Sequence, residues 1–181
     1  MRSNSAWAER VSGAIPAVDP EKAQSTELKR RVTAFALTKA GTWFSSQVGA
    51  RIDPWLLRAT RGRVDHTLGQ IPVVLVTVRG ARSGLERTVP LLYFSDGDDV
   101  ILIASSYGRA KFPSWYYNLK ANPDVTLEAR GRSAAYVAHE AEGEEHDRLF
   151  ELAKLVYSGY NEYERRTSGI RRIPVMRLSP A

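Results

Sequence analysis

Short apolar runs that come in pairs joined by polar turns constrain the fold of this chain more than any other feature. The runs are β-branched or aromatic and bounded by Pro, Gly, Asn and Asp, so each predicts a strand. They cover residues 73–78, 87–94, 100–104, 125–129, 133–141 and 173–178. Asp96-Gly97-Asp98-Asp99 joins the second run to the third, and Arg130-Gly131-Arg132 joins the fourth to the fifth. Both are typical hairpin turns, which favours antiparallel pairing.

Predicted helices lie between some of these strands, but strands and helices do not alternate regularly. Pro113 is suited to opening a helix over residues 114–120, and Asn122-Pro123 ends it. Residues 142–156 are acidic at the start and apolar at helical spacing, which predicts an amphipathic helix. The pattern indicates an α+β, barrel-like, mostly antiparallel domain and argues against a doubly wound parallel sheet.

The N-terminal third has a different character. Residues 1–24 are polar with scattered Gly and Pro, which predicts a flexible arm, and residues 25–48 have the spacing of an amphipathic helix. Tryptophan-containing clusters with interleaved arginines follow. Such a segment docks on its own barrel, docks on a second subunit of a homodimer, or lies in a membrane interface, and we expect docking. We therefore divide the chain into an N-terminal arm and helical extension, residues 1–68, and a barrel domain, residues 69–181.

Composition limits the partners. The chain has 181 residues, a formal charge of +6 and no cysteine, which excludes disulfides and thiolate chemistry and fits a reducing cytoplasm. No apolar run approaches the length of a membrane span. The arginines are dispersed and accompany no nucleic-acid-binding signature, so we expect a polyanionic small molecule and no nucleic acid. The histidines lack metal-ligand spacing, and we expect no metal site.

The segment from Gly80 to Arg87 is the strongest candidate for binding that anion. It reads Gly-Ala-Arg-Ser-Gly-Leu-Glu-Arg, so glycines allow close backbone approach while Arg82 and Arg87 offer paired hydrogen bonds. Spacing alone leaves an ordinary surface turn as an equal alternative. For three other groups of residues the sequence alone favours a structural role: a simple strand exit at Ala104-Ser105, a core Trp115 beside a surface Asn118, and an aromatic stripe packed on the barrel for the tyrosines at residues 157, 160 and 163.

The order of these motifs resembles the deazaflavin-dependent nitroreductase family, whose members are split β-barrels that use coenzyme F420. The resemblance covers residues 71–178 and rests on the 80–87 turn, Pro90 through Asp96-Gly97, Ala104-Ser105, Pro113-x-Trp115 and Asn118-Leu119-x-Ala121-Asn122-Pro123. The chain departs from the family where a glycine pair commonly follows Ala-Ser, because Ser106-Tyr107 stands there.

The resemblance implies which residues bind and react. It assigns coenzyme F420 to Arg82, Ser83, Gly84, Arg87, Ala104, Ser105, Lys111, Trp115 and Asn118. It assigns substrate positioning or proton donation to Tyr160, Tyr163 and Tyr93. The protein is then an oxidoreductase that transfers a hydride from the reduced deazaflavin to a small, apolar, unsaturated or nitro-bearing substrate. The alternatives are an FMN-dependent split-barrel reductase and a non-catalytic protein that binds deazaflavin or lipid.

Overall fold

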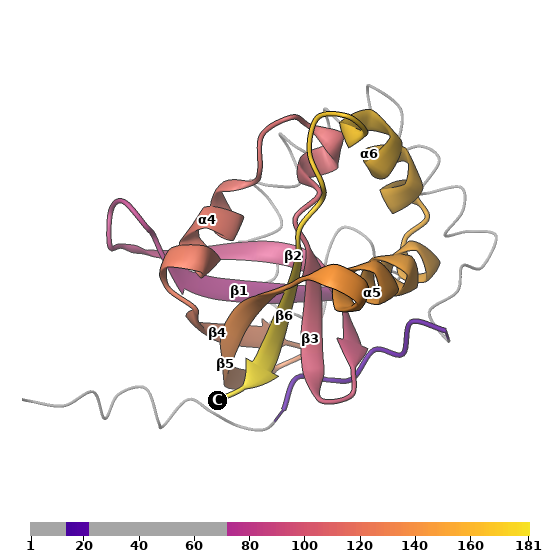
Figure 1. Ribbon diagram of the computed structural model, residues 1–181. Helices are drawn as coiled ribbons and strands as arrows, with labels where there is room; N and C mark the ends of the chain where they lie inside the picture. Colours follow the sequence, from indigo (N-terminus) through magenta and orange to yellow (C-terminus); the bar gives the residue numbers. More distant parts are fainter. Residues whose placement is uncertain (1–13, 22–71) are drawn as a thin grey trace, which may run out of the picture.

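A computed structural model describes residues 14–21 and 72–181, which form a closed antiparallel barrel with helices outside it (Figure 1). The six strands of the barrel follow the order β1-β2-β3-β6-β5-β4, and β4 closes the ring by pairing with β1. Their bounds are β1 Val73–Arg79, β2 Glu86–Asp96, β3 Asp99–Ile103, β4 Asp124–Ala129, β5 Arg132–Ala141 and β6 Val175–Pro180. The predicted antiparallel split barrel is confirmed.

Both predicted hairpin turns are present as two-residue connections. Asp96 pairs with Asp99 across the β2–β3 turn, and Gly97 between them has φ +64°. Ala129 pairs with Arg132 across the β4–β5 turn, where Arg130 and Gly131 both adopt positive φ. Two consecutive positive φ values match the twist of the flanking strands, which fixes the register of that hairpin.

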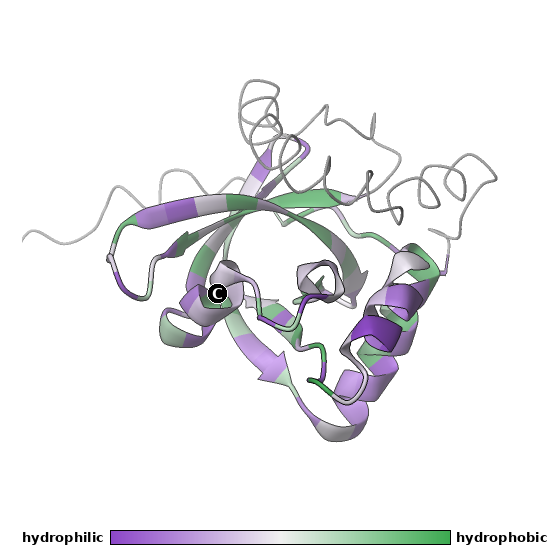
Figure 2. Ribbon diagram, turned by 90° about the horizontal axis from the view of Figure 1, so that it is seen from above, coloured by the Kyte–Doolittle hydropathy of each residue, from purple (hydrophilic) through white to green (hydrophobic). Residues whose placement is uncertain are grey.

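The strands separate two hydrophobic clusters because successive side chains point to opposite faces. Along β3, Val100 and Leu102 belong to the cluster inside the barrel, whereas Ile101 and Ile103 belong to the one outside it. The hydropathy colouring of Figure 2 shows this alternation along the strands and a hydrophilic tip on the long β1–β2 hairpin.

In the described part of the chain, three helices and a short 3-10 turn lie outside the barrel. The outer cluster lies under α5, Gly143–Val156, and α6, Gly159–Thr167. The third helix, α4, Ser114–Ala121, lies beside β1 and β5, and the 3-10 turn η3, Ser106–Gly108, lies against α6 (Figure 1). Pro113 and Asn122 flank α4 as predicted.

Residues 14–21 form a strap along the end of the barrel, so the prediction of a flexible arm is wrong for this stretch. Ile15 is 6% exposed and joins the inner cluster. The Val18 amide donates to the Ser95 hydroxyl at 3.0 Å, and the Ser95 amide donates to the Val18 carbonyl at 2.8 Å. The Tyr93 hydroxyl donates to the Pro16 carbonyl at 2.9 Å. This stretch is mostly apolar within residues 1–24, and its buried side chains and these hydrogen bonds hold it to the barrel.

The predicted helix over residues 25–48 and its tryptophan clusters lie outside the described residues, so the 1–68 extension and its docking stay predictions. Within the described part of the chain, no helix is both long and apolar enough to cross a membrane.

Candidate active site

The basic turn between β1 and β2 is ordered by its own backbone. The Gly80 amide donates to the Leu85 carbonyl at 2.8 Å, and the Gly84 amide donates to the Gly80 carbonyl at 2.9 Å. Gly84 has φ +67° and nothing within 4 Å of the place where a Cβ would lie. The Ser83 hydroxyl accepts a long hydrogen bond from the Leu85 amide at 3.4 Å. Residues 81–85 of the loop are exposed, so a ligand can approach the backbone there.

Helix α4 holds this turn through two asparagine side chains. Asn118 Oδ1 accepts from the Ala81 amide at 3.0 Å, and Asn122 Nδ2 donates to the Arg79 carbonyl at 3.1 Å. Trp115 is 9% exposed and packs into the inner cluster, which anchors the helix to the barrel. The described partner of Asn118 is therefore the turn itself.

The turn carries exposed positive charge without internal neutralisation. Arg82 and Arg87 are exposed, and neither forms an ion pair with another described residue. Lys111, on the loop before α4, is exposed and equally without an ion pair among the described residues. Two fork-shaped guanidinium groups on an ordered loop are a donor set that suits phosphate or carboxylate, so these residues fit the anionic tail of coenzyme F420.

The loop after β3 adopts a left-handed conformation. Ala104 is fully buried, and Ser105 has an ordinary helical φ of −68°. The next three residues have positive φ: 51° at Ser106, 58° at Tyr107 and 72° at Gly108. Such a conformation costs a non-glycine residue about 1–2 kcal/mol. The departure from the family's glycines thus falls on positions where the backbone favours glycine.

The predicted tyrosines of α6 form a buried cluster with Phe150. Tyr160 is 5% exposed and Tyr163 is 4% exposed, and their ring centroids lie 6.1 Å apart. The Tyr157 and Tyr163 hydroxyls are 3.3 Å apart. Burial raises the pKa of Tyr160 and of Tyr163 well above that of an ordinary phenol, so both are neutral at physiological pH.

Two of these phenols differ in how their hydroxyl groups are used. The Tyr163 hydroxyl is paired with Tyr157, whereas the Tyr160 hydroxyl has no hydrogen-bond partner within residues 14–21 and 72–181. A buried hydroxyl without a partner is costly and calls for an explanation. The ring of Tyr163 also meets Tyr107 edge to face at 6.3 Å, which brings the tyrosine cluster to the left-handed loop.

The structure does not bring Tyr93 to the other tyrosines. Tyr93 points into the barrel, belongs to the inner cluster and donates its hydroxyl to Pro16. Tyr160 and Tyr163 belong to the outer cluster. Tyr93 points inward because side chains alternate along β2, whereas Tyr160 and Tyr163 lie on α6 outside the barrel.

Two residues that shape the site were not assigned a role from the sequence. Asn122 appeared as a helix stop and as part of the family's motif without a role, yet its side chain donates to the Arg79 carbonyl and holds the basic turn. Arg171, between α6 and β6, donates to the Ser105 carbonyl at 2.8 Å and to the Arg109 carbonyl at 2.9 Å. No local motif marks Arg171, because its partners lie more than sixty residues earlier in the chain.

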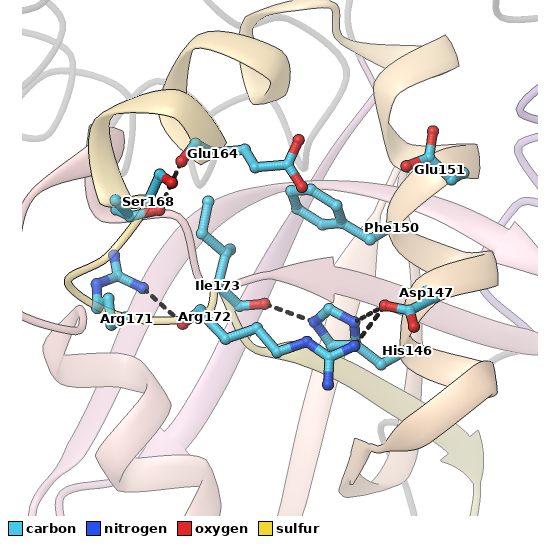
Figure 3. Close-up of a pocket in the computed structure, with 10 residues that line it drawn as sticks. His146, Asp147, Phe150, Glu151, Glu164, Ser168, Arg171, Arg172 and Ile173 are labelled. Atoms are coloured by element: carbon cyan, nitrogen blue, oxygen red, sulfur yellow. Dashed lines mark hydrogen bonds and ion pairs between the residues drawn. The ribbon is translucent and has the colours of Figure 1, made fainter.

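A cavity of about 170 Å³ lies behind Arg171 between α5 and α6 (Figure 3). Its carboxylates are already engaged: Asp147 by Arg172, and Glu151 and Glu164 by Lys154 at 2.6 and 2.9 Å. Buried His146 uses Nε2 to donate to the Ile173 carbonyl at 2.8 Å. We therefore regard the cavity as part of the support for the α6–β6 connection.

A closed antiparallel barrel with an ordered basic turn, a small-residue strand exit and a buried phenol cluster defines a split-barrel oxidoreductase of the flavin and deazaflavin class. The family model of the F420H(2)-dependent quinone reductases matches residues 49–180. The chain belongs to this family and is an oxidoreductase that uses coenzyme F420.

Relatives agree with that assignment. An F420H(2)-dependent quinone reductase of Mycobacterium tuberculosis strain H37Rv is 34% identical over 144 residues, which cover 76% of this chain and 95% of the relative. A solved F420-H2 dependent reductase, FDR-A, is 39% identical with a TM-score of 0.55, covering 60% of this chain and 94% of that one. A solved domain-swapped dimer is 32% identical with a TM-score of 0.58, covering 78% of this chain and all of that one.

Proposed function

We propose that this protein reduces a small, apolar quinone with a hydride from reduced coenzyme F420. The observation that carries the proposal is the ordered Gly80–Leu85 turn in a member of this family: Arg82 on the turn and Arg87 at the start of β2 both lack ion pairs among the described residues. The named relatives are quinone reductases, which supports a quinone over other acceptors. Enones and nitroaromatics, the other substrates expected from the sequence, accept a hydride in the same way.

The residues of the turn and of the strand exit hold the cofactor in this proposal. Arg82 and Arg87 bind the anionic tail with their guanidinium forks, and Ser83 and Gly84 let the backbone approach it. Ala104 and Ser105 present a small surface for a flat ring, while Trp115 and Asn118 position the helix beside it. Lys111 adds positive charge to the same side. When bound, reduced coenzyme F420 supplies the hydride.

The tyrosine cluster serves the acceptor. Tyr160 and Tyr163 are neutral phenols in an apolar setting, so each can donate a hydrogen bond or a proton where negative charge develops. We assign proton donation first to Tyr160, because its hydroxyl has no partner among the described residues. Reduction of a quinone to a hydroquinone takes one hydride and one proton, and in this proposal the Tyr160 phenol gives that proton and regains one from water afterwards. Tyr93 points into the barrel, so any role for it is the least supported of the three.

The experiment is an anaerobic assay of reduced coenzyme F420 with menadione, 2-cyclohexenone and a nitrobenzene derivative as separate acceptors. We expect oxidation of the cofactor, with return of its absorbance, to be fastest with menadione. Cofactor that binds but stays reduced with every acceptor would overturn the proposal and favour a non-catalytic binding protein.

We also propose a cytoplasmic homodimer. The absence of cysteine fits a reducing compartment, and a relative of similar sequence forms a domain-swapped dimer. Light scattering on the purified protein should give twice the chain mass of 20.2 kDa, and a monomer mass at micromolar concentration would contradict the dimer.

A further inference from the structure

We propose that Arg171 is a positioning residue that fixes the left-handed loop after β3 as the surface on which the cofactor ring lies. The role in cofactor binding rests on the proposed function, whereas the contacts between Arg171 and the loop are those of the described residues. The side chain comes from the connection between α6 and β6, and it reaches a loop that joins β3 to α4 (Figure 1).

The guanidinium of Arg171 spans both ends of the left-handed turn. Its Nη2 donates to the Ser105 carbonyl at 2.8 Å, and its Nε donates to the Arg109 carbonyl at 2.9 Å. These two carbonyls lie immediately before and after the three residues with positive φ. The guanidinium carbon also lies 4.7 Å from the Phe112 ring centroid, a cation–π contact with the same loop. One side chain therefore contacts the loop at three points.

The turn needs such external support because its own bonds are few. Gly108 donates to the Ser105 carbonyl at 3.0 Å, and Arg109 donates to the Ser106 carbonyl at 3.1 Å. These bonds must offset a steric cost, because Ser106 and Tyr107 are L-residues in the left-handed region. Strain of this kind persists only where surrounding contacts over-determine the backbone. Arg171 supplies those contacts with charge-assisted hydrogen bonds, which are stronger than neutral ones.

Arg171 is itself held firmly in place. The amide of Arg171 donates to the Thr167 carbonyl at 3.0 Å at the end of α6. Two residues further on, the Ile173 carbonyl accepts from His146 of α5, as Figure 3 shows. Arg171 forms no ion pair with a carboxylate among the described residues, so its hydrogen bonds go to backbone carbonyls.

Two other arginines provide matched controls. Arg172 is the next residue, and among the described residues its side chain forms an ion pair with Asp147 and no hydrogen bond to the loop. Arg177 lies within β6, is only 18% exposed and binds Asp96 at the end of β2 and Asp99 at the start of β3, at the end of β3 opposite the loop. Arg177→Ala therefore reports what the loss of a structural arginine does to stability without disturbing the loop.

The first test measures coenzyme F420 affinity in Arg171→Ala, Arg171→Lys, Arg172→Ala and Arg177→Ala. We expect Arg171→Ala to weaken binding about tenfold or more, Arg171→Lys to recover part of the loss, and both controls to bind as the wild type does. Arg177→Ala should lower thermal stability at least as much as Arg171→Ala. Equal affinities in all four variants would overturn the role in cofactor binding.

The second test is independent of the cofactor. Hydrogen exchange of the Gly108 and Arg109 amides in the ligand-free protein should be about tenfold faster in Arg171→Ala than in Arg172→Ala. If these amides exchange at the wild-type rate, Arg171 does not position the loop and the inference fails. If exchange accelerates while the wild type binds no coenzyme F420, the proposed function fails and the positioning of the loop stands.

Discussion

The side chain of Asn118 accepts a hydrogen bond from the backbone amide of Ala81 at 3.0 Å, which ties helix α4 to the basic turn between β1 and β2. These residues are 37 positions apart in the chain. The contact gives Asn118 a function that does not require it to touch a ligand. It keeps the arginines of the turn at a fixed place beside the barrel.

Asn118→Ala should therefore weaken coenzyme F420 binding about fivefold and lower the free energy of unfolding by about 1 kcal/mol, the worth of one hydrogen bond. Asn122→Ala removes the other tie, to the Arg79 carbonyl, and should act in the same direction. Asn161→Ala is the control, because that side chain bonds only to the nearby Ser158 carbonyl. Fluorescence titration and urea unfolding check these values. A loss of affinity in Asn118→Ala but none in Asn122→Ala would mean that Asn118 contacts the cofactor directly.

Tyr160→Phe should slow turnover without destabilising the protein. The Tyr160 hydroxyl is buried without a partner among the described residues, so its removal leaves the free energy of unfolding unchanged or raised. Tyr163→Phe, by contrast, breaks the contact with the Tyr157 hydroxyl and should cost about 1 kcal/mol. With menadione, we expect kcat of Tyr160→Phe to fall about a hundredfold while KM changes little. Wild-type turnover in this variant would refute the proton-donor role.

Ser106→Gly should stabilise the protein slightly, whereas Ser105→Gly should destabilise it slightly. Ser106 has φ 51°, where glycine relieves about 1–2 kcal/mol of steric cost and more than offsets its own entropic penalty. Ser105 has φ −68°, so glycine brings only the penalty of about 0.5–1 kcal/mol. Chemical denaturation compares the two variants, which share the same change of side chain. Equal destabilisation would show that the left-handed backbone is not strained at Ser106.

Asp96→Asn should make stability less dependent on acid pH. Hydrogen bonds from Arg148 hold the pKa of Asp96 below its usual value, so the folded state favours the ionised carboxylate. The stabilisation is present above the unfolded pKa and is lost as pH falls through the lower folded pKa. At pH 7 we expect the variant to be less stable by about 2 kcal/mol, as for charged hydrogen bonds, and the difference to shrink below about pH 4.

The control for this titration is Asp98→Asn, in the same turn. Asp98 is exposed and forms no ion pair with another described residue. Its replacement should leave stability within about 0.5 kcal/mol of the wild type at every pH. A constant difference between Asp96→Asn and the wild type from pH 7 down to pH 3 would contradict the assignment of this acid dependence to Asp96.

The strands and their pairing were accessible from the sequence because local signals specify them. β-branched runs with Asp-Gly and Arg-Gly turns determine a hairpin within a few residues of chain. The strap at residues 14–21 was not accessible in this way. Its hydrogen bonds reach Tyr93 and Ser95, 77 residues away, and its eight residues with two prolines are too short to show a helix or strand period.

The site shows the same division between local and distant information. The glycine and arginine pattern of residues 80–87 points to an anion without any structure. The dependence of that turn on Asn118 and Asn122, and of the next loop on Arg171, comes from contacts between elements that meet only when the barrel closes. The side chain of Tyr93 points into the barrel because of the register of β2, which its neighbours in sequence do not specify.

The most direct test of the account is a tryptophan-fluorescence titration with coenzyme F420 and, in parallel, FMN. It compares the wild type with Arg82→Gln, Arg87→Gln and, as the control, Arg132→Gln, which removes an exposed arginine at the β4–β5 turn. We predict saturable binding of coenzyme F420 in preference to FMN, a loss of about tenfold in affinity for each of the first two variants, and none for the control. Undiminished binding by both Arg82→Gln and Arg87→Gln, or preference for FMN, would contradict the claim that this turn is the coenzyme F420 site.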